Sequence, residues 1–190
     1  MSISGKQTDF TGYELPDSGV VAAGAPYQWS RSDAMKDFDY FVSTLGERIV
    51  MLDRLTTRND GPKLDFTDES VALLNDWFVD RAEPDPDQEN WPGGLTSEWY
   101  SVVGDMKAYL GEVLRKRKPN LHWVLWTRSK KDVAYQTPVI AGFNNVPNKN
   151  YNVDYGRIIA MLGQRIVQGD LREDSRRILL NVLLDDVASA

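Results

Sequence analysis

The chain has 190 residues, contains no cysteine and carries a formal net charge of −6. The length fits one domain with a sizeable core, and a hydrophobic content of 42% is typical of a globular protein rather than a disordered one. The missing cysteines exclude disulfides and thiolate metal sites, the acidic balance disfavours nucleic acid as a partner, and no apolar run reaches the roughly 20 residues of a membrane span.

The first 29 residues contain scattered Gly, Pro and Ser and show no lasting periodicity. They predict an extended N-terminal arm, residues 1–29, followed by a single domain, residues 30–190. The first ten residues have neither a basic start nor an apolar stretch, so we expect no signal peptide, no membrane partner and a cytoplasmic location.

Two helices are expected in the first half of the domain. Ser30 or Ser32 can cap the first, and an Asn-Asp-Gly-Pro turn at residues 59–62 ends it. Thr67 can cap the second, with acidic residues next to its N-terminal dipole. The buried stripe of the first helix follows steps of three and four residues: Ala34, Phe38, Phe41, Leu45, Ile49, Leu52 and Leu55.

A third helix is expected over residues 97–118, with one consistent apolar face. Residues 121–127 predict a strand, residues 128–132 a turn, and residues 133–143 a second strand that completes a β-hairpin. The segment at residues 63–66 can be a short strand or only a connector.

The C-terminal part predicts two more helices. One covers residues 153–168 and is bounded by Gly169. The other is expected to start at Asp170 and Glu173, which have the spacing of a capping box, and to reach Val187. This last helix is apolar around much of its circumference, so we expect it either in the core or in contact with a partner. The predicted fold class is therefore α+β, with about five helices packed around a small antiparallel sheet or β-hairpin.

A Leu-Gly-Glu or Leu-Gly-Gln motif occurs in three predicted helices, at residues 45–50, 110–115 and 162–167. The intervals between the copies differ, so they do not form a structural repeat. A glycine inside a helix is destabilising by about 0.5–1 kcal/mol relative to alanine, and close approach of a neighbouring element usually offsets this cost.

In the third helix, Gly104, Ala108 and Gly111 share a narrow stripe nearly opposite the large apolar face. We infer that this helix is sandwiched between other helices and either the hairpin or a partner. Glu112 borders the stripe. A partly buried carboxylate that accepts from a tryptophan indole, from Arg115 or from backbone N–H groups is the favoured interpretation, and a general acid or base is the alternative.

His122 is the only histidine, which excludes a metal site with two histidines. Acidic residues alternate at Asp85, Asp87 and Glu89, as in calcium loops, but Asn90 and Thr96 stand where such loops have Gly and Glu. We therefore expect a solvated acidic loop, no metal and no cofactor. No Gly-rich phosphate loop or nucleophile elbow is present, and no catalytic residue is predicted.

Charge is distributed unevenly along the chain. Nine acidic residues and one arginine lie within residues 65–90, and seven cationic residues and one glutamate lie within residues 112–131. Such asymmetry can steer a charged partner. The two cationic clusters, residues 115–118 and 128–131, flank a strand about 20 Å long, so they do not predict one nucleic-acid patch.

Residues 109–142 resemble a group of uncharacterised small bacterial domains in which a Tyr-Leu-Gly-Glu helix leads into a tryptophan-bearing strand and then a strand with a proline. The matching positions are Tyr109, Leu110, Gly111, Glu112, Trp123 and Pro138. The acidic helix start at residues 65–78 also suits that group. The resemblance implies an α+β domain of unknown activity, and some of these domains are similar to immunity or accessory proteins of bacterial toxin systems.

The sequence favours a protein that acts through protein–protein contact, as an accessory or immunity-type protein without catalysis whose acidic surface meets a basic partner. A small-ligand-binding protein or enzyme is the alternative, with a cleft between the 97–118 helix and the 121–141 hairpin. Its ligand-binding residues would be Tyr109, Glu112, Arg115 and His122. A homo-oligomer joined through the C-terminal helix is the third hypothesis.

Overall fold

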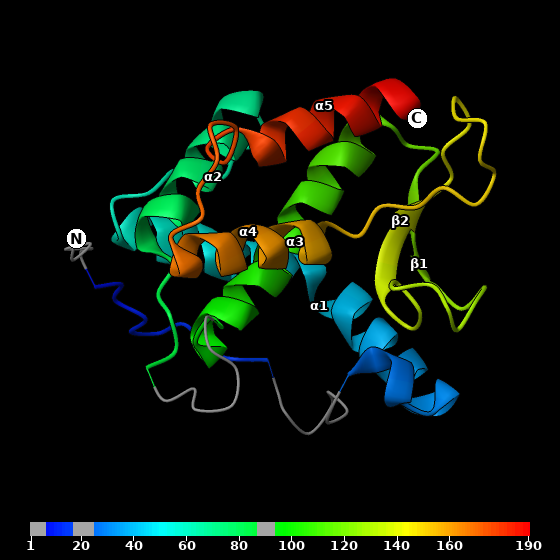
Figure 1. The fold of residues 1–190 in the computed structure, drawn as a ribbon, viewed down its shortest axis with the longest axis horizontal. Helices are drawn as coiled ribbons and strands as arrows, with labels where there is room; N and C mark the ends of the chain where they lie inside the picture. The colour runs from blue at the N-terminus through cyan, green and yellow to red at the C-terminus, as the bar shows by residue number, and fades with distance from the viewer. Residues whose placement is uncertain (1–6, 17–24, 87–93) are drawn as a thin grey trace.

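The computed structural model describes residues 7–16, 25–86 and 94–190. Within them the chain forms five α-helices, one short 3-10 helix and two strands (Figure 1). In chain order these are η1 (Pro26–Gln28), α1 (Arg31–Arg58), α2 (Asp68–Arg81), α3 (Ser97–Arg117), β1 (His122–Leu125), β2 (Pro138–Ala141), α4 (Tyr155–Gln168) and α5 (Ile178–Ser189). The predicted α+β class, with about five helices and a small antiparallel sheet, is confirmed.

The first two helices begin where the capping residues predict. The Ser30 side chain accepts from the backbone N–H of Asp33 at the start of α1, and Thr67 accepts from Ser70 at the start of α2. These bonds satisfy N–H groups that the first helical turn leaves without a partner. The segment at residues 63–66 is a connector rather than a strand.

α3 is the central element of the fold. It contacts α1, α4 and α5, and Figure 1 shows it between α2 on one side and the hairpin on the other. Its large apolar residues are fully buried in the main core, among them Trp99, Met106 and Leu110. Burial of this kind is the dominant favourable contribution to folding.

β1 and β2 form an antiparallel pair in which His122 lies opposite Ala141 and Leu125 opposite Pro138. The hairpin prediction is confirmed, but its second strand begins at residue 138 and not at residue 133. Gln136 has a positive φ of 62°, which a strand cannot accommodate. Its buried side chain donates to the carbonyl oxygens of Pro26 and Trp29, which precede α1. Residues 126–137 therefore form turns, and these hydrogen bonds attach them to the segment before α1.

α5 begins at Ile178, and the predicted start at Asp170 and Glu173 is wrong. The residues between them form turns. The reason lies in α2, where the buried Asn75 side chain donates to the Ser175 carbonyl and accepts from the Leu179 N–H. The Asn75 side chain, about 100 residues away in the sequence, thus supplies a hydrogen-bond partner for a backbone N–H in the first turn of α5. α4 ends as predicted, at Gly169 with a left-handed φ of 69°.

The described part of the N-terminal arm is packed against the domain. Phe10 lies edge-on against Trp99 with ring centroids 5.6 Å apart. The Asn59 side chain accepts from the Asp9 N–H at 2.8 Å and donates to the Asp9 carbonyl. The arm is thus pinned through residues 7–16. Residues 17–24 of the predicted arm, and the part of the predicted acidic loop that contains Asp87 and Glu89, lie outside the described residues.

α5 lies at the edge of the core. Leu179 and Leu183 are buried, whereas Leu184 is exposed, so one side of this helix is available and a homo-oligomer through it stays a prediction. Along the described residues, no helix has the combination of length and apolar content that crossing a membrane requires.

Candidate functional site

A cleft of about 230 Å³ lies between α1 and α3, with β2 at one end. Below it is called the α1–α3 cleft. It is lined by Pro16, Asp37, Tyr40, Phe41, Thr44, Leu45, Arg48, Tyr100, Ser101, Gly104, Asp105, Lys107, Ala108 and Pro138. Half of these residues have apolar or aromatic side chains, and four carry charge. This combination suits a ligand that has both an apolar portion and a charge.

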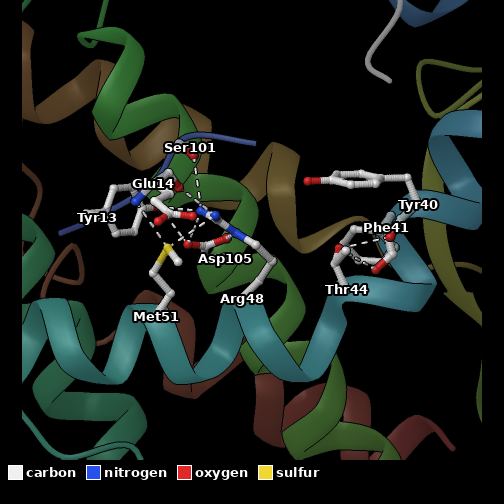
Figure 2. Close-up of polar contacts among 9 residues, drawn as sticks. All are labelled: Tyr13, Glu14, Tyr40, Phe41, Thr44, Arg48, Met51, Ser101 and Asp105. Atoms are coloured by element: carbon white, nitrogen blue, oxygen red, sulfur yellow. Dashed lines mark hydrogen bonds and ion pairs between the residues drawn. The ribbon is translucent and has the colours of Figure 1, made fainter. Parts of the chain in front are cut away.

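One end of the cleft is formed by a buried ionic network (Figure 2). The guanidinium of Arg48, on α1, donates to both carboxylate oxygens of Asp105, on α3, at 2.7 and 2.8 Å. Tyr13, from the arm, donates its hydroxyl to the same carboxylate at 2.5 Å. Burial raises the pKa of the Asp105 carboxyl, and the Arg48 and Tyr13 hydrogen bonds oppose that shift. All three polar groups therefore have partners inside the protein.

The second cation of the cleft is Lys107, on α3. Its ammonium lies 3.2 Å from the Asp154 carboxylate, which also accepts from the Arg157 N–H at the start of α4. The same ammonium lies 5.5 Å from the centre of the Phe41 ring. Lys107 is buried, and burial of a charge is tolerated when it has a partner of opposite sign. Lys107 therefore belongs to the link between α3 and α4.

Asp37, on α1, is the remaining charged group. It is half-buried and makes no hydrogen bond or ion pair with any residue that the structure describes. Burial raises the pKa of the Asp37 carboxyl, and the Lys107 charge partly offsets the shift. Because Arg48 and Lys107 each have a carboxylate of their own, the charge of Asp37 is left over in the cleft.

Aromatic side chains form much of the remaining wall. Tyr40 and Phe41 come from α1, and Tyr100 comes from α3. Figure 2 shows Tyr40 and Phe41 at one end of this stretch of α1 and the Arg48 network at the other. Phe41 is fixed by an edge-on contact with Trp123 of β1, with ring centroids 4.8 Å apart. Gly104 faces open space in the cleft, since a Cβ atom there would meet nothing within 4 Å among the described residues.

A second feature of α1 lies on its outer side. Met35, Val42 and Val50 are 40%, 41% and 48% exposed, and at about 100° per residue they fall within one sector of the helix. Gly46 lies in the same sector, and a Cβ atom there would meet nothing within 4 Å. We call these four residues the α1 stripe. Unlike Gly111 of α3, which lies against Trp123, Gly46 has no close neighbour among the residues that the structure describes.

The structure gives Glu112 the role that the sequence favoured. Its carboxylate accepts from the Trp123 indole N–H at 2.8 Å and from Arg115 at 2.6 Å. Gly111 is the reason that Trp123 can lie so close, because a Cβ atom there would be 2.1 Å from the indole ring. The small stripe of α3 therefore meets the hairpin at Gly111 and borders the open cleft at Gly104.

The four proposed ligand-binding residues do not converge. Glu112 and Arg115 form one ion pair. The Tyr109 hydroxyl is buried and bonds to Ser70 and the Phe66 N–H. His122 is exposed, with its ring near the Asn120 carbonyl. The α1–α3 cleft is thus formed by other side chains, and among the described residues no cluster of His, Asp and Glu is placed to hold a metal ion.

Part of the acidic segment is neutralised by the fold. Arg176 reaches Asp76 and Asp80 at 3.4 and 2.6 Å, and Arg117 pairs with Asp68 at 2.7 Å. Exposed pairs of this kind contribute little stability. They do reduce the negative electrostatic potential around α2. A partner would therefore meet less negative charge there than the count of acidic residues in 65–90 indicates.

Sequence reasoning missed the cleft and its ionic network. Arg48, Asp105 and Tyr13 are far apart in the sequence and fit no spacing motif. The one available signal was Asp105, a charged residue among apolar neighbours in α3. Comparisons with protein-family models, with curated proteins and with solved structures found no match to this chain. The resemblance of residues 109–142 to small bacterial domains therefore stays a prediction.

Proposed function

We propose that the protein acts by binding a basic partner protein through α1 and has no catalytic activity of its own. The observation that carries the proposal is the α1 stripe: Met35, Val42 and Val50 are exposed on one sector of the helix, and Gly46 in that sector meets no side chain of the described part of the chain that explains it. A mid-helix glycine is destabilising by about 1 kcal/mol relative to alanine. Close approach of a partner's backbone or side chain at Gly46 would offset that cost.

The charge of the protein supports a basic partner. The net charge is −6, and the exposed Asp39 lies in the same sector of α1 as the stripe. Opposite charge accelerates association and selects against acidic partners. The accessory or immunity-type role is the concrete form that the resemblance implies, and it rests on that resemblance alone.

The buried polar groups support a role without catalysis. The hydroxyl, carboxylate and guanidinium of the Tyr13–Asp105–Arg48 network are all engaged with one another. Each would have to break a buried hydrogen bond before it acted on a substrate, and such bonds are costly to leave unmade. A nucleophile paired with a base is the arrangement that covalent catalysis requires, and the residues of the α1–α3 cleft contain none.

Capture from an extract of the source organism tests the proposal with two matched variants. Val42→Lys places a positive charge in the α1 stripe, and Leu184→Lys does the same on α5, at sites that are 41% and 44% exposed. The captured protein is identified by mass spectrometry, purified and titrated against each form of the chain at two salt concentrations.

We expect Val42→Lys to lose the captured protein and Leu184→Lys to retain it, with weaker binding at the higher salt concentration because ions screen the attraction. Equal capture by the wild type and Val42→Lys would refute the role of α1. If light scattering instead found a dimer that only Leu184→Lys dissociates, the α5 homo-oligomer would replace this proposal.

A further inference from the structure

We propose that the α1–α3 cleft binds one cationic side chain, a lysine or an arginine, of the partner protein. This inference rests on the proposed function for the source of the side chain. It depends on three properties of the cleft that are independent of the α1 stripe: one carboxylate without an ion-pair partner, an aromatic wall, and an apolar lining.

The first property is the balance of charge. Arg48 is paired with Asp105 at 2.7 Å, and Lys107 is paired with Asp154 at 3.2 Å. Asp37 has no such pair among the residues that the structure describes. An incoming cation would therefore find one carboxylate available, while an incoming anion would meet two cations that are already neutralised. The cleft favours a single positive charge.

The second property is the aromatic wall. Tyr40, Phe41 and Tyr100 line the cleft with Asp37. The faces of aromatic rings attract cations, by about 0.5–1 kcal/mol at exposed sites and more where water is excluded. The Phe41 ring already makes such a cation–π contact, with the Lys107 ammonium 5.5 Å from its centre. The wall is thus suited to the same class of ligand as the carboxylate.

The third property is the apolar lining beside these groups. Leu45 and Ala108 are buried residues that line the cleft, and Gly104, which also lines it, faces open space. Lysine and arginine bury an aliphatic stem while they hold a charge at its end. Burial also raises the pKa of the Asp37 carboxyl, and a bound cation would lower it again by favouring the ionised form.

A titration followed by NMR tests the inference on the full chain. The probes are N-acetyl-lysine methylamide, N-acetyl-arginine methylamide and the neutral N-acetyl-norleucine methylamide, which matches the lysine stem without its charge. Amide shifts are followed in wild type, Asp37→Asn and Asp39→Asn. Asp39 is an exposed acid on the same helix, so its variant changes the net charge equally outside the cleft.

We expect saturable shifts in α1 around residues 37–48 and in α3 around residues 100–108 with at least one cationic probe. The neutral probe should bind at least about tenfold more weakly. Asp37→Asn should weaken binding of the cationic probe about tenfold, and Asp39→Asn should change it less than about twofold, because a carboxylate in direct contact contributes far more than an exposed charge.

Three results would overturn the inference. Equal binding of the neutral probe would make the cleft only an apolar groove. Equal losses in the two variants would indicate attraction to the whole surface, and shifts confined to other elements would place the site elsewhere. The proposed function is tested separately. If a captured protein requires Val42 but not Asp37, the proposed function stands and the inference about the cleft fails. If the cationic probes bind the cleft but no protein partner is captured, the cleft inference stands and the proposed function fails.

Discussion

Gly111→Ala should destabilise the protein, although the same change stabilises most helices. Alanine in place of glycine contributes about 1 kcal/mol to an ordinary helix. At this position the new Cβ atom would lie 2.1 Å from the Trp123 ring, so the indole must move. The contact to Phe41 and the hydrogen bond from Trp123 to Glu112 both depend on its present place.

The expected cost follows from these contacts. Overpacking in a well-packed site costs about 1–3 kcal/mol. Loss of a hydrogen bond to a charged group costs about 1.5–3 kcal/mol, and the lower end applies because the Glu112 side chain is 21% exposed. After the gain in helix propensity, we expect a net loss of about 2 kcal/mol in the free energy of unfolding.

Urea unfolding of the wild type and two variants measures this value. Gly46→Ala is the matched control, because it makes the same change in a helix where a Cβ atom meets nothing within 4 Å. It should stabilise the protein by about 0.5–1 kcal/mol. A Gly111→Ala protein as stable as the wild type would show that Trp123 can move without cost. That result would refute the inference that Gly111 is required for the close packing of the hairpin on α3.

Three further changes test other parts of the structure by the same measurement. Arg48→Met should destabilise by about 3–5 kcal/mol, because it leaves the buried Asp105 charge without its partner; a loss below about 1 kcal/mol would refute the buried pair. Burial raises the pKa of the Asp186 carboxyl to about 6 from 3.8. As the pH rises, Asp186 therefore ionises in the unfolded chain before it ionises in the folded protein. This difference should lower the free energy of unfolding by about 1 kcal/mol between pH 5 and pH 7. Asp186→Asn should abolish that fall, and a variant with the same pH profile as the wild type would contradict the assignment to Asp186. Thr67→Ala should cost about 1 kcal/mol by removing the cap that accepts from Ser70, and Thr67→Ser should restore most of it.

The sequence alone determined the helices that are specified by local chemistry. Ser30 and Thr67 cap α1 and α2 where they were expected, and Gly169 ends α4. These signals could be read because a cap bonds to a backbone group within the next three residues, and a buried stripe repeats with the period of the helix. The role of Glu112 was also accessible, since the tryptophan that it binds is only eleven residues away.

Only the tertiary structure decided the features that depend on distant residues. α5 starts at Ile178 because the Asn75 side chain of α2 bonds to the backbone of Ser175 and Leu179. β2 is shorter than predicted because Gln136 bonds to the Pro26 carbonyl, before α1. The α1–α3 cleft has the same origin. Among the described residues, the charge of Asp37 has no ion-pair partner because Arg48 is paired with Asp105 and Lys107 with Asp154. The sequence shows which charges exist, but the fold alone determines which of them pair with one another.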